Sequence, residues 1–406
     1  MAININAKTS GAGGLETTAD NTGNINIQSG GSTVMSVTSS GVAVTGSFSQ
    51  NGAVYSTQPS FRNLIINGDM RIDQRNSGAS VTPVTNQYTL DRFQFNITQT
   101  SKLTAQQNAG AITPPTGFTN YLGITSTSAY SITAGDTFVV RQKIEGNNIA
   151  HLGWGTANAK TVTLSFWVRS SLTGTFGGSL KNASSDAYPF SYSISSANTW
   201  EQKSITIPGS TSGTWATDNT TGMFVQFGLG AGSTFSATAG VWNTSNSNSA
   251  TGATSVVGTS GATFYITGVQ LEVGTTATDF ENLPYDVELA RCQRYFQSFG
   301  GSNVAETVGQ GTSFSTISTY VLINLLQTMR SVPSLGYSAV GDWRLHYPGV
   351  TGQEATAMSI ATNDSNNTKV IVNTTTATNA SMGGGKCIQL TADSTISARL
   401  TFDAEL

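Results

Sequence analysis

The segment TVTLSFWVRSS, residues 161–171, decides the fold class of this 406-residue chain. Its alternate positions carry apolar side chains, namely Val162, Leu164, Phe166 and Val168. Neighbouring side chains of a β-strand point to opposite faces, so this pattern predicts a strand with one face in a core. Comparable runs recur at 138–146, 190–196, 200–207, 223–230 and 264–273, with turn residues between them. The chain is therefore predicted to be all-β, with a two-sheet antiparallel sandwich as its body.

The composition excludes several classes of partner. Only 10% of the residues are charged, the net charge is −3, and there are 44 glycines. A thin and slightly acidic charge distribution offers no basic face to a phosphate backbone, so we expect no nucleic acid partner. The start of the chain lacks a secretory signal pattern, and no apolar run reaches the roughly 18 residues of a membrane span. We therefore expect no membrane insertion.

The pattern divides the chain into four parts. Residues 1–60 contain short alternating patches at Ile25/Ile27, Val34/Val37 and Val42/Val44, separated by glycine turns, and too few apolar residues for a core. Strands this poor in apolar side chains need partners, so we expect identical copies to intertwine here, with a flexible tail as the alternative. The other predicted parts are a sandwich over 61–283, a connecting helix over 284–300 and a β-rich domain over 301–406.

The predicted helix is DVELARCQRYFQSF, residues 286–299. Pro284 supplies a start signal, and one helical face carries apolar residues, namely Leu289, Cys292, Phe296 and Phe299. Farther on, residues 317–325 and the short segment Lys369 to Asn373 alternate as strands. The closing stretch STISARLTFDAEL places every second residue from Ile396 to Leu406 on one apolar face, which predicts an ordered end.

Few residues suit catalysis. The only histidines, His151 and His346, belong to no metal-binding or nucleophile motif, and no GxSxG elbow is present. Paired carboxylates for glycoside cleavage remain an alternative, with the candidates Glu145, Asp136, Glu272, Asp279 and Glu281. Carboxylates in turns usually satisfy backbone amides or arginines, so we expect no enzymatic activity and no catalytic residue. Cys292 and Cys387 are expected to be free, buried thiols.

Aromatic side chains offer candidate carbohydrate-binding residues. Trp167 belongs to the strand face opposite Phe166 and Val168, where its ring could stack on a sugar or pack under a loop or another subunit. Trp215 and Trp242 lie in turn-rich segments, where loop aromatics serve either contact or capping of the sandwich. The three tryptophans are the predicted sugar contacts.

Several segments resemble a known family. NLIINGDMRIDQRNSG (63–78), YTLDRFQF (88–95), the 268–297 stretch beginning GVQLEVG, LLQTMRSVPSL (325–335) and the closing FDAEL resemble bacteriophage fibre and appendage proteins. Those proteins carry a jelly-roll domain similar to carbohydrate-binding modules. SGVAVTGSFSQNG, residues 40–52, resembles the short β segments of trimeric phage fibre shafts and anchors.

The resemblance implies a structure and a function. In such jelly rolls the segment around Asn67 and Gly68 is the first strand, pairing near the last strand, and a structural calcium often lies at that end. Asp69 and either Asp279 or Glu281 would be its ligands here; the alternative is that the Asp/Arg run of 69–75 forms ion pairs with Asp91, Arg92 or Glu281. No other cofactor is implied.

The implied protein is a homotrimeric virion fibre. It would be made in the host cytoplasm, dock on other virion proteins of a tail or head through residues 1–60, and bind host-surface glycan or another receptor. Two rival functions remain open: a purely architectural decoration protein, and a tailspike that degrades glycan.

Overall fold

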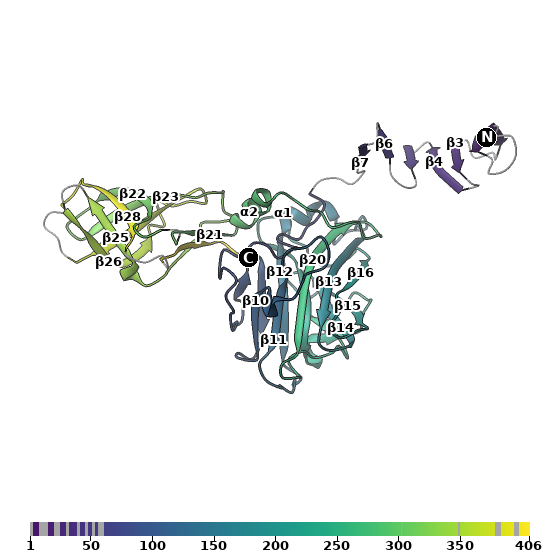
Figure 1. Ribbon diagram of the computed structural model, residues 1–406, viewed down its shortest axis with the longest axis horizontal. Helices are drawn as coiled ribbons and strands as arrows, with labels where there is room; N and C mark the ends of the chain where they lie inside the picture. Colours follow the sequence, from purple (N-terminus) through teal and green to yellow (C-terminus); the bar gives the residue numbers. More distant parts are fainter. Residues whose placement is uncertain are drawn as a thin grey trace. The chain divides into compact units, whose positions relative to one another are not determined.

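The computed structural model describes residues 61–301, 303–347, 350–377, 383–393 and 398–406, together with the strands of the first sixty residues. Two compact units are present, Met1–Arg62 and Asn63–Leu406. The chain is nearly all β, as the sequence predicts (Figure 1). No helix in this described part has the length and apolar character needed to cross a membrane.

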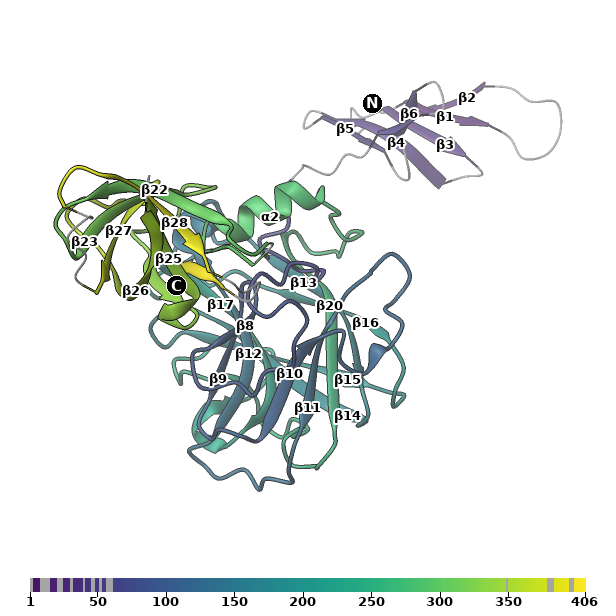
Figure 2. The same ribbon diagram turned by 60° about the vertical axis from the view of Figure 1, so that its left-hand side comes forward.

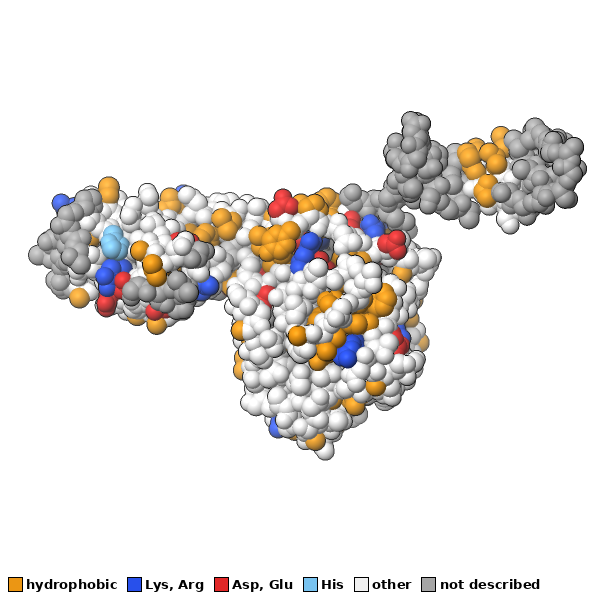
Figure 3. Space-filling view, in the orientation of Figure 1, with side chains coloured by type: hydrophobic (Ala, Val, Ile, Leu, Met, Phe, Trp, Pro, Cys, Tyr) orange, Lys and Arg blue, Asp and Glu red, His pale blue; other side chains and the backbone are white. Residues whose placement is uncertain are grey.

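The first unit is built from short strands. One sheet has the order β2-β1-β3-β4-β5, and β6 and β7 form a hairpin (Figure 2). The bounds are β1 Ile3–Ala7, β2 Leu15–Ala19, β3 Ile25–Ser29, β4 Ser32–Thr38, β5 Gly41–Val44, β6 Phe48–Gln50 and β7 Ala53–Tyr55. Burial is described for residues 25–28 and 32–37, and none of these is buried, with Ile25 43% exposed. Apolar side chains of this sheet are therefore accessible (Figure 3).

The body of the second unit is the predicted sandwich. One sheet has the order β10-β11-β20-β13-β16 and the other the order β15-β14-β17-β12-β9-β8, all with antiparallel neighbours. The bounds are β8 Tyr88–Leu90, β9 Phe93–Ile97, β10 Leu103–Gln107, β11 Leu122–Ser126, β12 Thr137–Glu145, β13 Val162–Ser170, β14 Gly174–Lys181, β15 Ala187–Ile194, β16 Glu201–Ile207, β17 Thr221–Ala231 and β20 Thr263–Val273. Each run that the sequence marked as a strand is one.

The core lies between these two sheets. The apolar face of β13, including Phe166, is fully buried, and the Phe166 ring packs edge-on against Tyr192 and Phe227 of the opposite sheet at 5.0 Å. Alternation along each strand thus selects the side chains that fill the interior. Short elements complete the body: α1 Gly146–Ile149, β18 Ser236–Ala237, β19 Ser249–Ala250 and single 3₁₀ turns at Ala109–Ala111, Ala150–Leu152 and Ser233–Phe235.

The segment 63–76 is not the strand that the resemblance implies. It runs beside the end of β20 as a series of turns, with Leu64 N donating to Leu271 O (2.9 Å) and Val269 N donating to Gly68 O (2.9 Å). A Cβ at Gly68 would lie 2.1 Å from the Val269 oxygen, so only glycine fits this approach. The segment lies beside β20, as the resemblance implies, but it forms tight turns there instead of a strand.

The connecting helix is shorter than predicted. Helix α2 covers Tyr285–Gln293, and the chain then enters strand β21, Phe296–Phe299. This strand pairs antiparallel with β29, Leu400–Asp403, so the backbone groups of Phe296 and Phe299 are taken by the end of the chain. The two aromatics match a helical face and a strand pattern equally well, and a partner that is distant in sequence decides between them.

The C-terminal part contains a closed barrel of order β22-β23-β27-β26-β25-β28 and a three-stranded sheet β21-β29-β24 (Figure 2). The bounds are β22 Thr307–Ser313, β23 Ser318–Asn324, β24 Ser334–Tyr337, β25 Trp343–Tyr347, β26 Val350–Ile360, β27 Lys369–Thr376 and β28 Cys387–Ala392, with a 3₁₀ turn at Val340–Asp342. The predicted strands near 317–325 and 369–373 are present as β23 and β27. Ala398, Leu400, Phe402 and Ala404 are buried, as predicted, while Ile396 lies outside the described residues.

Within the Asp/Arg run of 69–75, Asp69 pairs with Arg71, and Arg75 contacts the C-terminal segment. We call Arg75, Arg92, Asp403 and Glu405 the arginine clamp. Arg75 pairs with Asp403 (3.0 Å) and Glu405 (2.9 Å), and Arg92, 1% exposed, pairs with the other oxygen of Glu405. The Arg92 guanidinium also lies 3.4 Å from the centroid of the Tyr295 ring. Ion pairing was the alternative predicted from sequence, but the main partners are Asp403 and Glu405 rather than Asp91 or Glu281.

Candidate functional site

Two of the predicted sugar contacts belong to an aromatic cap. The Trp215 ring centroid lies 4.7 Å from that of Trp154 and 5.8 Å from that of Trp242, and all three rings meet edge-on. Each indole nitrogen donates to a backbone carbonyl, those of Lys160, Ser212 and Pro208. Trp215 is 8% exposed, so its faces are covered by protein. This packing favours the capping role that the sequence left open for Trp215 and Trp242.

Trp167 lies on the outer face of the five-stranded sheet and is half-buried. It follows an irregularity in the pairing of β13 with β20, and the position at Gly268 has φ +62°, where a Cβ would lie 2.6 Å from Phe118 and 3.1 Å from Trp167. Phe118 in turn packs edge-on against Phe280 at 5.1 Å. Hydrophobic side chains gather over β13 and β20 (Figure 3). Sugar stacking on Trp167 stays a prediction, with local aromatic packing as its alternative.

The candidate catalytic carboxylates have structural partners. Asp136 accepts hydrogen bonds from Thr133 N and Oγ1, Thr98 Oγ1 and Tyr130 Oη. Burial raises the pKa of its carboxyl, but these hydrogen bonds outweigh burial and lower the pKa to about 2. Glu145 accepts two hydrogen bonds from Arg294, at 2.8 and 2.9 Å.

The remaining carboxylates are placed in a similar way. Glu272 accepts hydrogen bonds from Thr278 N (2.9 Å) and Gln270 Nε2 (2.9 Å). Glu281 accepts one from Asn63 N, whereas Asp279 is exposed. These contacts give Glu272 and Glu281 a local structural role.

The predicted calcium ligands do not form a ligand set. Asp69 and Glu281 both line a small enclosed space that also contains Arg71 and Arg291, and Asp69 pairs with Arg71 at 2.8 Å. Burial raises the pKa of the Asp69 carboxyl, a shift that disfavours the charged form a cation needs. Among the described residues no group of three or more His, Cys, Asp or Glu side chains is arranged to hold a metal. Asp69 is engaged by Arg71, and the calcium site stays a prediction.

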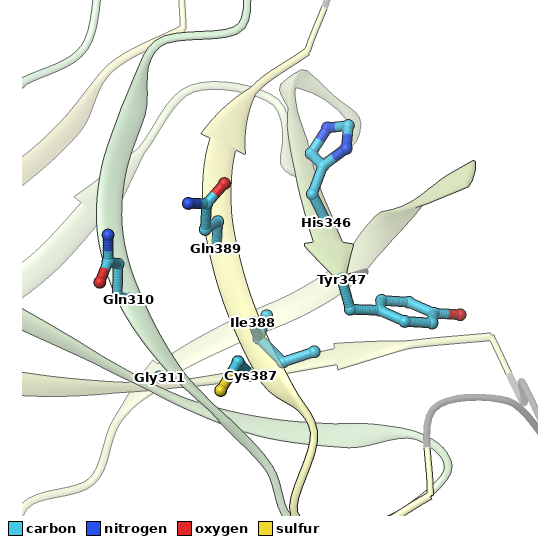
Figure 4. Close-up of a pocket in the computed structure, with 7 residues that line it drawn as sticks. All are labelled: Gln310, Gly311, His346, Tyr347, Cys387, Ile388 and Gln389. Carbon is cyan, nitrogen blue, oxygen red and sulfur yellow. The ribbon is translucent and has the colours of Figure 1, made fainter. Parts of the chain in front are cut away.

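The C-terminal barrel has a hollow of about 420 Å³ on its surface (Figure 4). Gln310, Gln389 and His346 lie in register on the neighbouring strands β22, β28 and β25. Cys387 also lines it and is exposed, so the expectation that both cysteines are buried is wrong for Cys387 and correct for Cys292. Cys387 is the first residue of β28, at an outward position, where its side chain cannot reach the barrel core.

The outer face of the six-stranded sheet carries an arrangement that the sequence did not reveal. Two rows of side chains cross it. The first row is Lys143 on β12, Phe224 on β17 and Lys181 on β14, which are directly paired across the strands. The second row, one step along, consists of Gln94, Arg141, Gln226 and Ser179. We call these seven residues the Phe224 face. Five of them lie on the neighbouring strands β9, β12 and β17 (Figure 2).

The Phe224 ring is surrounded by cations. The Arg141 guanidinium lies 5.0 Å from the ring centroid, Lys181 Nζ lies 5.5 Å away and Lys143 Nζ 5.9 Å away. The ring itself is half-buried, so part of it reaches the surface between them. An aromatic ring at this spacing attracts each cation and holds the three near one another.

Amide side chains accept hydrogen bonds from Arg141 and Lys181 and hold these two cations in place. Arg141 Nε donates to Gln94 Oε1 (2.8 Å) and its Nη2 to Asn86 Oδ1 (3.0 Å). Lys181 Nζ donates to the amide oxygens of Asn246 and Asn248. The arrangement is a partly exposed ring bordered by positioned amides and cations, and such a ring with a few convergent polar groups is what small polar ligands require.

Comparisons with known proteins find partial matches among solved structures. No protein-family model matches the chain, and no curated protein matches it. Among solved structures, a putative sugar binding protein from Bacteroides thetaiotaomicron is 13% identical over 52% of this chain and 100% of that one, with a TM-score of 0.31. The enzymatically active domain of bacteriophage CBA120 tailspike protein 4 is 12% identical over 52% of this chain and 22% of that one (TM-score 0.29). TmCBM61 in complex with β-1,4-galactotriose is 9% identical over 52% of this chain and 99% of that one (TM-score 0.28).

Proposed function

We propose that this chain is a fibre protein of a bacteriophage particle that attaches the particle to host-surface glycan through the Phe224 face. The observation that carries the glycan part is the half-buried Phe224 ring bordered by positioned amides and cations. The apolar face of a sugar ring stacks on an aromatic side chain, while its hydroxyl groups need amide and cationic partners.

The attachment role is tested by glycan-array binding of the full-length chain. We expect the chain to bind host glycans, and Phe224→Ala to lose most of that binding. Trp215→Phe is the matched control, since it alters the buried cap and leaves the Phe224 face intact. Folded protein that binds no glycan would favour the architectural alternative instead.

The assembly part of the proposal is a homotrimer formed through residues 1–60, which also dock on other virion proteins. Its support is the absence of buried residues at 25–28 and 32–37, since strands with accessible apolar side chains gain stability by covering them with further copies. Sedimentation of the full-length chain is expected to give a trimer, and a well-ordered monomer would contradict this. Gold labelling of intact particles tests the location on the virion.

The glycan-degrading alternative is tested separately. Host polysaccharide incubated with the full-length chain is expected to remain intact, because the candidate carboxylates are engaged by Thr133, Arg294 and Asn63. Release of oligosaccharides that is lost in Glu145→Gln or Asp136→Asn would establish a tailspike.

A further inference from the structure

We infer that the Phe224 face takes an acidic glycan, whose carboxylate supplies a counter-charge that the protein itself lacks. This inference deepens the function proposed above and depends on it. It names the chemical class of the ligand, which is a sugar polymer with carboxylated residues.

The first step is the charge balance of the face. Within the described part of the chain, Arg141 and Lys181 form no ion pair with an Asp or Glu side chain, and their hydrogen bonds go to amide oxygens. Lys143 differs, because its Nζ donates to the main-chain oxygen of Leu406, the last residue of the sequence. Glu405 also influences the pKa of Lys143, but its two oxygens are held by Arg75 and Arg92. Two like charges, those of Arg141 and Lys181, therefore lie near each other without a carboxylate partner.

The second step is burial. Arg141 is 8% exposed and Lys181 is 7% exposed, so neither charge is hydrated as it would be on an open surface. Burial lowers the pKa of the Lys181 ammonium, and the neighbouring Arg141 lowers it further, to about 8. The pKa of Lys143 is likewise about 8, first because of burial and then because of Arg141. Buried cations with no partner are costly to a fold, and a bound carboxylate would offset that cost.

The third step is an acceptor with no partner. Gln226 is fully buried in the second row, and its Nε2 donates to Ser179 Oγ and Asn248 Oδ1. Its Oε1 has no hydrogen-bond partner among the described residues. This oxygen is enclosed by protein, so it is a further unsatisfied polar group of the face and not itself a surface contact.

These groups together describe one ligand. The cations would bind a carboxylate, and the Phe224 ring would cover the apolar side of a pyranose. A uronic acid or sialic acid residue carries both features.

The test is binding of the full-length chain to an array that carries uronate- and sialate-containing glycans, each beside its carboxyl-reduced form, together with neutral glycans. We expect binding to acidic members and a loss of about tenfold or more on carboxyl reduction. Lys181→Gln and Lys143→Gln should each weaken acidic binding by about tenfold, while Lys369→Gln, an exposed lysine on the barrel, should not.

The outcomes distinguish a failure of the acidic assignment from a failure of the proposed glycan attachment. Binding to neutral glycans that is unaffected by carboxyl reduction would overturn the acidic assignment and leave glycan attachment intact. No binding to any glycan would overturn both. Equal competition by inorganic phosphate at the same concentration would overturn the sugar assignment in favour of a simple anion site. Should Lys181→Gln fail to fold, the half-buried Lys143→Gln decides the same question.

Discussion

Two clusters of basic side chains lie in the second unit, and they differ in one respect. In the arginine clamp each guanidinium has a carboxylate partner, with Arg75 on Asp403 and Glu405 and Arg92 on Glu405. On the Phe224 face, Arg141 and Lys181 have only amide oxygens. Removing one member of a buried ion pair leaves the other charge uncompensated and destabilises the fold. A buried charge that has no carboxylate partner can instead gain one from a ligand. We propose that this difference separates charges that stabilise the fold from charges that bind a ligand.

The arginine clamp should give the largest effect. Arg92→Ala leaves one oxygen of the buried Glu405 without its partner, so we expect the free energy of unfolding to fall by about 3–5 kcal/mol. Urea unfolding measures this change. Lys203→Ala is the control, since its pair with Glu201 lies near the surface and should contribute about 1 kcal/mol or less. A loss below about 1 kcal/mol for Arg92→Ala would show that the clamp does not stabilise the fold.

The same measurement on the Phe224 face should give a different result. Lys181→Met removes a buried ammonium that has no counter-charge, so the free energy of unfolding should stay within about 1 kcal/mol of the original or rise. Glycan binding should be lost at the same time. Destabilisation by Lys181→Met as strong as that by Arg92→Ala would contradict the proposed difference between the two clusters.

The pH dependence sharpens the comparison further. The folded-state pKa of Lys181 is lowered to about 8 from 10.5, so above pH 8 the folded protein releases a proton that the unfolded chain retains. Stability of the original protein therefore rises with pH in the window from 8 to 10.5. Relative to Lys181→Met, it should gain on the order of 1 kcal/mol between pH 7 and pH 9. Arg141 is the charged group that acts on Lys181, and it stays protonated at pH 9 because its own pKa is about 10, lowered by burial.

Urea unfolding of both proteins at the two pH values provides the measurement. Titrations at other sites cancel in the difference between the two proteins. A difference that is constant with pH would mean that Lys181 keeps an ordinary pKa.

The smallest effect is expected from chelation. Asp69 and Glu281 already bind Arg71 and Asn63 N, so treatment with EDTA and dialysis should change Tm by less than about 1 °C. Differential scanning calorimetry before and after chelation measures it. A clear fall in Tm that added calcium reverses would restore the metal site implied by the resemblance.

The sequence predicts much of the fold, because strand alternation is a local property. Phe166 and Val321 are assigned to the core by their neighbours alone, and both are fully buried. The end of α2 could not be predicted this way, since Phe296 becomes a strand residue only through its pairing with Asp403, far along the chain. The ion pairs of the arginine clamp could not be predicted either, because they also join residues that are far apart in the sequence.

The candidate site is harder to predict, for a similar reason. Lys143, Phe224 and Lys181 are separated widely in sequence and meet only through the register of β12, β17 and β14. A local signal did exist: Phe224 and Lys143 occupy positions on the side opposite the core in otherwise apolar strands. Pattern alone cannot show that two such positions share one row. The aromatic residues chosen instead, Trp215 and Trp242, are conspicuous in sequence because they lie in loops.

The most direct test of the comparison is the pKa of Lys181 itself. NMR titration of its ammonium group in the full-length chain should give a value near 8 without ligand. With a saturating acidic glycan taken from the array, the pKa should rise toward its ordinary value, because the carboxylate would supply the counter-charge. A pKa that stays the same when the glycan is bound would contradict the claim that the Phe224 face is a binding site for acidic sugars.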